Sequence, residues 1–360
     1  MNTLIIGQNT KMAKVFSLIS DNVYITIDKT NNNYRRYDEI SEFPTIELNN
    51  ITEFKNIFNS CINLKKIIHE NNIDVIFTNE VKSMIVAYLT YIMSKKRKII
   101  LLSISHNSYT WCNNIKAFIY SYLIKFLTHG FVSLSSFVTN ILISNNVNIN
   151  RIFTTSNPIE QNLFECKTNY YISNNKPTLV YIGVQNIDKG QRTLIESINI
   201  LKRKGIEVHL TLIGDIVDTN YHLQNLSYIN DHNLTDNITF LGKVENNEIR
   251  ITLHKYDLYI CPSYMEMSPY NILEAKSAGL PIIATNVGGI PEIITNRMDG
   301  IIVNPKKPDE LSDSIELLIS NVNLRKEIGL NAYQNACRKH TPQNVADSLS
   351  QFISKLYIIK

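Results

Sequence analysis

Residues Cys261–Gly289 read CPSYMEMSPYNILEAKSAGLPIIATNVGG, and this stretch decides how the rest of the chain is interpreted. Ser268 is suited to cap a helix, Pro269 to occupy its first position and Gly279 to end it. The apolar run at 258–261 predicts a buried strand that leads into this helix. Free N–H groups and the positive end of the helix dipole point the same way, so the stretch predicts an anion site.

Two carboxylates flank the start of the predicted helix. Glu266 lies just before it, and Glu274 lies about one and a half turns inside it. Taken alone, the pair is equally well explained by a helix cap and a solvated helix residue. Pro262–Ser263 before the pair and Gly288–Gly289 after it favour a ligand site, because such residues shape tight loops.

Size and composition indicate two domains and exclude several classes of protein. A chain of 360 residues with 44% hydrophobic residues is long enough for two cores. Its formal net charge of +4 is too small to predict a nucleic-acid partner. The five cysteines form no C-x-x-C pair, which fits free thiols in a reducing, cytoplasmic compartment.

The first half, residues 1–160, predicts a Rossmann-like α/β domain. Short apolar runs alternate with helical patterns, which is typical of a parallel sheet covered on both faces; the runs are 4–6, 23–27, 75–77, 99–104, 131–134 and 152–153. Ligands of such sheets bind beyond the carboxyl ends of the strands, which points to Gly7 and His106. No G-x-G-x-x-G follows Gly7, so a dinucleotide-dependent oxidoreductase is poorly supported.

A basic cluster in this half has two interpretations. Lys95, Lys96, Arg97 and Lys98 are either a solvated helix end or a contact with an anionic membrane surface. No apolar run reaches the length of a membrane-spanning helix, so any membrane contact is expected to be peripheral.

The second half predicts another α/β domain over 178–340, after a polar linker at 161–177. Its apolar runs are 179–182, 208–213, 238–241, 258–261, 281–284 and 301–303. The first run ends at Gly183, and Lys189 follows beside the start of a helix at Gln191. An ammonium at a helix N-terminus is suited to meet a diphosphate, although most lysines in such turns are solvated.

The spacing of Glu266 and Glu274, followed by A-x-x-x-G-x-P-I-I-A-T-x-x-G-G, resembles the nucleotide-sugar site of the retaining glycosyltransferases of family 4. The resemblance implies the α/β GT-B fold, in which two Rossmann-like domains with parallel sheets face a central cleft. It also implies that a last helix, at 341–360, crosses back to the first domain. Dense over about thirty residues, the match is specific in the second half and only general in the first.

The resemblance also implies roles for individual residues. Glu266 would hold the donor sugar together with the amides of Met267 and Ser268, and Glu274 would bind the ribose hydroxyls. Amides of the helix start would face the diphosphate; these belong to Tyr270, Asn271 and Ile272.

Residues outside this stretch complete the implied site. Gly7, Gly183 and Lys189 would contact the phosphates, backbone near Val244 would bind the base, and His106 would approach the reacting sugar. The family's G-R-x-x-x-x-K-G pattern has its Arg replaced here by Val184. Loss of that cation puts leaving-group stabilisation in doubt, and Arg192 is the candidate that would compensate.

These residues predict an enzyme that transfers a sugar, with retention, from a nucleoside diphosphate sugar to a hydroxyl of a glycan or lipid-linked saccharide. UDP is the favoured nucleotide, surface polysaccharide synthesis the expected context, and the inner face of the cell membrane the expected place. The sequence has no Asp-x-Asp, so we expect no metal and no cofactor. A GT-B sugar-nucleotide epimerase and a catalytically silent sugar-nucleotide-binding partner at the membrane remain as alternatives.

Overall fold

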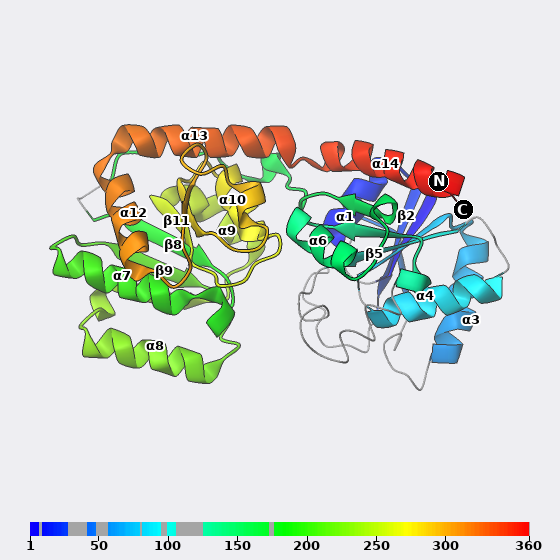
Figure 1. Cartoon of the computed structure of the whole chain (residues 1–360), viewed down its shortest axis with the longest axis horizontal. Helices are drawn as coiled ribbons and strands as arrows, with labels where there is room; N and C mark the ends of the chain where they lie inside the picture. Colours follow the sequence, from blue (N-terminus) through cyan, green and yellow to red (C-terminus); the bar gives the residue numbers. More distant parts are fainter. Residues whose placement is uncertain are drawn as a thin grey trace. The chain divides into compact units, whose positions relative to one another are not determined.

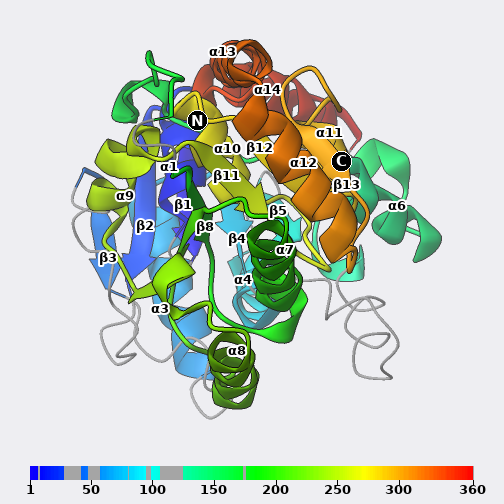
Figure 2. The same cartoon turned by 90° about the vertical axis from the view of Figure 1, so that its left-hand side faces the viewer.

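A computed structural model describes residues 1–6, 9–27, 42–47, 57–79, 81–94, 99–105, 125–172 and 176–359. The chain divides into two compact units. The first contains 1–158 together with 342–360, and the second contains 159–341. Figures 1 and 2 show that each unit is a sheet with helices on its faces.

The described strands of the first unit form one parallel sheet of seven strands in the order β3-β2-β1-β4-β5-β6-β7. They are β1 (Asn2–Ile6), β2 (Asn22–Ile27), β3 (Thr45–Glu47), β4 (Val75–Thr78), β5 (Ile100–Ser105), β6 (Gly130–Ser133) and β7 (Ile152–Thr154). Every apolar run predicted as a strand is one. β3 was not predicted, because an edge strand of three residues has too little buried surface to leave an apolar pattern.

Helices cover both faces of this sheet. The described ones are α1 (Thr10–Ser17), α3 (Ile57–Glu70), α4 (Val81–Ser94), α6 (Ser136–Ser144) and α14 (Pro342–Ile359). α1 and α14 share one core with the sheet, and α3 and α4 share the core on its other face. The last helix is thus part of the first unit: Phe352 stacks on Phe153 with ring centroids 5.6 Å apart.

The second unit has a parallel sheet of six strands in the order β10-β9-β8-β11-β12-β13. Its strands are β8 (Thr178–Ile182), β9 (His209–Ile213), β10 (Ile238–Gly242), β11 (Leu258–Cys261), β12 (Ile282–Thr285) and β13 (Ile301–Val303). Its helices are α7 (Gln191–Arg203), α8 (Thr219–Asp231), α9 (Asn246–Thr252), α10 (Tyr270–Ser277), α11 (Ile290–Ile293), α12 (Pro308–Ser320) and α13 (Val322–Lys339). The strand order reverses between β8 and β11, and ligands of open parallel sheets bind beside such a reversal.

Residues 161–172 belong to the second unit, although their composition predicts a linker. Lys167 is buried, and its Nζ donates to the carbonyl oxygens of His254 and Tyr256, both at 2.9 Å. Tyr170 is also buried, and its hydroxyl donates to the carbonyl of Gly279. Polar side chains satisfy carbonyl groups that secondary structure leaves unpaired here, so a polar composition does not mean an exposed segment.

Candidate donor site in the second unit

The two loops that follow β8 and β11 are joined to each other directly. The backbone N–H of Tyr264 donates to the carbonyl of Asp188 at 2.7 Å, and the hydroxyls of Tyr264 and Thr193 lie 2.6 Å apart. Gly190 has φ +65°, and a Cβ there would lie 2.1 Å from the carbonyl oxygen of Pro262. Only glycine permits this approach, so backbone geometry requires the glycine of the K-G pair.

Lys189 and Glu266 form an ion pair across these loops. Lys189 Nζ donates to Glu266 Oε1 at 2.5 Å, with the lysine side chain 24% exposed and the glutamate 11%. Ser263 Oγ donates to the same oxygen at 3.2 Å. Glu266 Oε2 accepts no hydrogen bond among the described residues, so one carboxylate oxygen of a fixed side chain remains for a ligand hydroxyl.

The two glycines that end the motif hold the backbone of Glu266. Gly288 has φ +52°, and a Cβ there would lie 1.6 Å from the carbonyl oxygen of Glu266. The N–H of Gly289 donates to that oxygen at 3.1 Å. This contact gives the G-G pair a physical reason, since any side chain at 288 would displace the glutamate.

Helix α10 starts at Tyr270, with Pro269 rather than Ser268 as its N-cap. The prediction of a serine cap is therefore wrong by one position, and no side chain caps this end. Asn271 fixes the start instead: its Nδ2 donates to the carbonyl of Ile182 at 2.6 Å, and its Oδ1 accepts from the N–H of Ile272 at 2.9 Å. The helix start is thereby tied to the end of β8, and the N–H of Ile272 is already used within the protein.

Glu274 lies inside α10 and is only 8% exposed. Its helical neighbours Ile272, Leu273 and Ala275 are buried in the core of the unit. The interpretation of Glu274 as a solvated helix residue is therefore excluded. A carboxylate is costly to bury, so its position calls for polar partners within the fold or in a ligand.

The missing cation is not replaced by Arg192. Its Nε donates to Glu196 at 2.8 Å, and its Nη1 donates to the carbonyl of Gln224 at 3.1 Å. Its guanidinium also lies 4.1 Å from the ring centroid of Tyr228 on α8. These contacts commit Arg192 to the packing of α7 against α8. Val184, which is 36% exposed, occupies the position of the family's arginine, and its side chain carries no charge.

The structure describes two more of the residues that the sequence places in the site, Gly183 and Val244. Gly183 follows β8 and pairs with β9 through its N–H and the carbonyl of Ile213, and a Cβ there would lie 2.2 Å from the Tyr181 hydroxyl. Val244 is half-buried against the core that includes α10. Three predictions lie outside the described residues: Gly7, His106 and the cluster at 95–98.

Four residues beside the ion pair, Ser263, Tyr264, Thr285 and Lys306, were given no individual role by the sequence. Ser263 donates to Glu266, and its carbonyl accepts from Thr285 Oγ1 at 2.5 Å. Lys306 places its Nζ 5.1 Å from the ring centroid of Tyr264, which brings a second cation to these loops. Ser263 could have been found from its place between a strand end and Glu266, whereas nothing in the sequence connects Lys306 to Tyr264.

Cys261, at the end of β11, is not a reactive thiol. It is fully buried, and burial raises the pKa of its thiol to about 12. The thiolate is the nucleophilic form, so this cysteine stays inert at neutral pH.

Neither a metal cluster nor a membrane span is found in the described part of the chain. No three His, Cys, Asp or Glu side chains gather there in a way that could hold a metal ion. No helix there is long and apolar enough to cross a bilayer.

One family model matches a part of the chain that lies within the second unit. Residues 167–335 match the family described as Glycosyl transferases group 1. The D-inositol 3-phosphate glycosyltransferase of Paenarthrobacter aurescens is 29% identical over 144 residues, 39% of this chain and 35% of that protein. The N,N'-diacetylbacillosaminyl-diphospho-undecaprenol alpha-1,3-N-acetylgalactosaminyltransferase of Campylobacter jejuni is 31% identical over 161 residues, 45% and 40% of the two chains. Each match spans less than half of the relative.

A solved structure resembles the whole chain. Anabaena HepE in complex with UDP and glucose has a TM-score of 0.80 and 17% identity, and the match covers 98% of this chain and 99% of that one. Two parallel-sheet units, with a charged site at the strand reversal of the second, define a GT-B protein, and this prediction of the fold is confirmed. The likeness to HepE concerns the fold, and residues 167–335, which lie within the second unit, resemble the group 1 glycosyl transferases.

Proposed function

We propose that this protein is a retaining glycosyltransferase that moves a sugar from a nucleoside diphosphate sugar, with UDP favoured, to a hydroxyl of a glycan or lipid-linked saccharide. The observation that carries the proposal is the Lys189–Glu266 pair at the strand reversal, beside the start of α10. The cation and the helix N-terminus suit the diphosphate and the negative charge that it gains on leaving. The available carboxylate oxygen suits a hydroxyl of the sugar.

Each group has a distinct part in the proposed reaction. Glu266 Oε2 accepts a hydroxyl of the donor sugar, assisted by the amides of Met267 and Ser268. Lys189 and the amides of Tyr270 and Asn271 neutralise the charge that develops on the departing diphosphate. Glu274 binds the ribose hydroxyls. The leaving phosphate takes the proton of the acceptor, so the proposal names no protein nucleophile.

The proposal assigns no metal to the reaction. A divalent ion in a transferase neutralises the diphosphate, and here an ammonium and a helix dipole would do so. Because Val184 removes one cation from this set, the expected stabilisation of the leaving group is weaker than in a site with both. Activity is therefore expected to depend strongly on Lys189.

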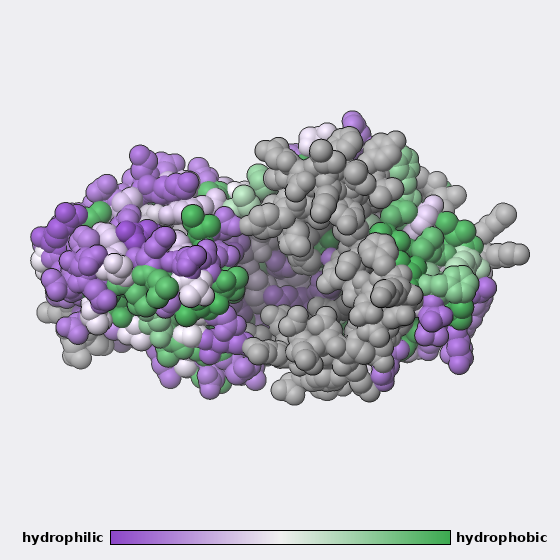
Figure 3. Space-filling model, turned by 90° about the horizontal axis from the view of Figure 1, so that it is seen from below, coloured by the Kyte–Doolittle hydropathy of each residue, from purple (hydrophilic) through white to green (hydrophobic). Residues whose placement is uncertain are grey.

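The names of the relatives motivate the choice of donor and acceptor. HepE was solved with UDP and glucose, and the Campylobacter relative is named for a lipid-linked diphospho-undecaprenol acceptor. Leu89 and Ile92 are exposed on α4, which carries no acidic residue and leads into the basic cluster at 95–98. Apolar and basic side chains together suit the inner face of a membrane. Figure 3 shows apolar residues gathered on the surface of the first unit.

The test is a panel of nucleoside diphosphate sugars, scored first by the melting temperature of the full chain. A specific donor stabilises the folded state by RT ln(1 + [L]/Kd), so one member should raise the melting temperature well above the others. That donor is then incubated with and without lipid-linked acceptors. Turnover only with an acceptor, giving an anomerically retained product, supports the proposal.

Other results would contradict it. Donor consumed without acceptor, with a new sugar configuration, would make the protein an epimerase. A donor that stabilises the chain but is never turned over would make it a silent binding partner.

A variant tests the ribose contact. Glu274→Ala should weaken donor affinity by about tenfold, since it removes hydrogen bonds to ribose. Unchanged affinity by calorimetry would remove Glu274 from the site.

A further inference from the structure

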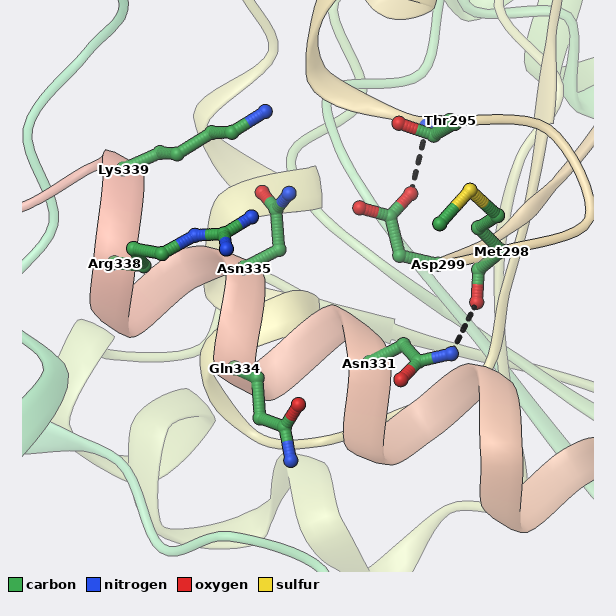
Figure 4. Close-up of a pocket in the computed structure, with 8 residues that line it drawn as sticks. All are labelled: Thr295, Met298, Asp299, Asn331, Gln334, Asn335, Arg338 and Lys339. Carbon is green, nitrogen blue, oxygen red and sulfur yellow. Dashed lines mark hydrogen bonds between the residues drawn. The ribbon is translucent and has the colours of Figure 1, made fainter.

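A polar cavity lies in the second unit, between α13 and the loop that follows α11. Its volume is about 330 Å³, and it is lined by Thr295, Met298, Asp299, Asn331, Gln334, Asn335, Arg338 and Lys339. Figure 4 shows the side chains of Arg338 and Lys339 extending from the last turn of α13 on the side of this loop. None of these residues belongs to the loops of the proposed donor site.

The floor of the cavity is a buried ion pair whose hydrogen bonds are complete. Lys276, fully buried on α10, donates to Asp299 Oδ2 at 3.0 Å, to the carbonyl of Ile293 at 2.6 Å and to Asn335 Oδ1 at 3.0 Å. The other oxygen of Asp299 accepts from the N–H of Thr295 at 2.7 Å. The one carboxylate that lines the cavity is therefore neutralised, and it does not oppose the entry of an anion.

Two wall residues, Asn335 and Lys339, have donors without an acceptor in the described part of the chain. Asn335 uses Oδ1 for Lys276, and its Nδ2 makes no hydrogen bond among the described residues. Lys339 likewise makes no ion pair or hydrogen bond among them, and Arg338 lines the same cavity one position before it. Basic residues in the last turn of α13 are explained by the helix dipole alone. The dipole does not explain why the Asn335 amide, held in place by the buried Lys276, leaves its Nδ2 without an acceptor beside the cavity.

We propose that this cavity binds the phosphate group of a small, sugar-sized phosphate ester. Arg338 and Lys339 contact the phosphate, since guanidinium and ammonium groups are the side chains that recognise it. Asn335 Nδ2 donates to one of its oxygens, and Gln334 and Thr295 offer polar groups to the hydroxyls. A volume of about 330 Å³ is at the small end of ligand pockets, which favours a sugar phosphate over a nucleotide sugar.

This site is independent of the proposed function, but it contacts the same helix. Lys276 lies on α10 two residues after Glu274, and it joins that helix to the cavity through Asn335. A ligand that holds Asn335 therefore also holds the C-terminal part of α10. Binding should raise the melting temperature whether or not the donor site is functional.

The experiment is titration calorimetry of the full chain at low ionic strength with glucose 1-phosphate, inorganic phosphate and glucose. We expect binding of the two phosphates and none of glucose. Replacing both cations, Arg338→Gln with Lys339→Gln, should weaken binding of glucose 1-phosphate at least tenfold. Lys326→Gln, which removes one charge from an exposed position of α13 outside the cavity, should leave it unchanged.

Two further variants make the result specific. Asn335→Asp keeps an oxygen for Lys276 but places a carboxylate in the cavity, so it should fold normally and lose phosphate binding. Lys189→Gln should leave binding unchanged; loss of binding there would assign the phosphate to the proposed donor site and overturn the inference. Equal affinity of the wild type and the double variant would overturn it as well. Binding of anionic vesicles in preference to glucose 1-phosphate would also overturn it, because the ligand would then be a lipid surface.

Discussion

Two lysine–carboxylate pairs in the second unit have the same chemistry and different surroundings. Lys189–Glu266 joins two loops at the carboxyl edge of the sheet at 2.5 Å, with the side chains 24% and 11% exposed. Lys276–Asp299 joins α10 to the loop after α11 at 3.0 Å, with the side chains 0% and 4% exposed. The distances are similar, so the difference lies in how many hydrogen bonds each pair has left to make.

The buried pair has none left, and the loop pair has several. Lys276 donates all three of its protons within the protein, and both oxygens of Asp299 accept. At the loop pair, Glu266 Oε2 and two protons of Lys189 have no partner among the described residues. A saturated pair can only hold the fold, whereas an unsaturated pair that is fixed in place can bind a ligand.

The largest expected effect is on stability, from the buried pair. Lys276→Met leaves the Asp299 carboxylate buried without its cation, which should lower the free energy of unfolding by about 3–5 kcal/mol. Chemical denaturation measures this change as a shift in the unfolding transition of the second unit. Burial lowers the pKa of Lys276 while Asp299 opposes that shift, so the lysine depends on this partner.

A double substitution separates the charge effect from packing. Lys276→Met with Asp299→Asn removes both charges and should recover most of the loss, because replacing a whole buried pair is nearly neutral. If the single variant loses less than about 1 kcal/mol, the Lys276–Asp299 pair does not stabilise the fold as expected of a buried pair.

The next effect is on catalysis, from the loop pair. Lys189→Ala should lower kcat by about 10²–10³, since it removes a charge that stabilises the leaving group. The melting temperature should change little because the side chain is partly exposed. Steady-state kinetics with the donor selected by the melting-temperature panel measure the loss in kcat.

Lys204→Ala is the matched control: it removes an exposed lysine paired with Asp313 and Glu316 and should leave kcat unchanged. Wild-type turnover in Lys189→Ala would mean that Lys189 does not stabilise the leaving group.

The same contrast explains which parts of the molecule the sequence predicts. Strands are well predicted because a buried parallel strand needs a continuous apolar run. Among the described strands, only the three-residue edge strand β3 left no such signal. Lys189 and Glu266 were each found beside a strand end or a helix start. Their ion pair spans 77 positions, however, and depends on the neighbouring positions of β8 and β11, which local patterns do not encode.

Other features depend on long-range contacts that leave no local pattern. Lys276 looks like an ordinary surface residue of a short helix, and its burial follows from the loop at 295–299 and from α13. Residues 161–172 look like a linker because they are polar. Their polar groups, such as Lys167 Nζ, in fact satisfy carbonyls far away in the sequence, which no local pattern reveals. Arg192 was chosen by proximity in sequence, but α8 supplies its partners.

Acid should destabilise the protein through a histidine near the buried pair. Burial, together with the charges of Lys276 and Lys339, lowers the pKa of His340 from 6.5 to about 4. Between these values the unfolded chain takes up a proton that the folded chain does not. This stability is therefore complete above pH 6.5 and declines as the pH falls toward 4, by at most about 3 kcal/mol.

Denaturation curves between pH 7 and pH 4 measure the decline. The variant His340→Gln cannot take up this proton and should show a shallower loss of stability over the same range. Parallel curves for the two proteins would mean that another group is responsible. In Lys276→Met one of the two neighbouring positive charges is gone, so the pKa of His340 should rise toward its ordinary value.

The smallest expected effect is a gain, at the position where the loop pair lacks a cation. Val184 is 36% exposed, and its carbonyl accepts from Gln191 Nε2 at 2.8 Å, so the backbone is held by a contact that does not involve the valine side chain. Val184→Arg should therefore fold normally and place a guanidinium beside Lys189. With a second cation on the diphosphate, kcat should rise about tenfold, equivalent to about 1.4 kcal/mol. Val184→Gln, which is longer than valine and polar but carries no charge, should give no gain. A gain in both variants would assign the effect to size rather than charge. No gain in either would mean that the leaving group is already stabilised, and Lys306, which lies over the ring of Tyr264, is the cation to test next.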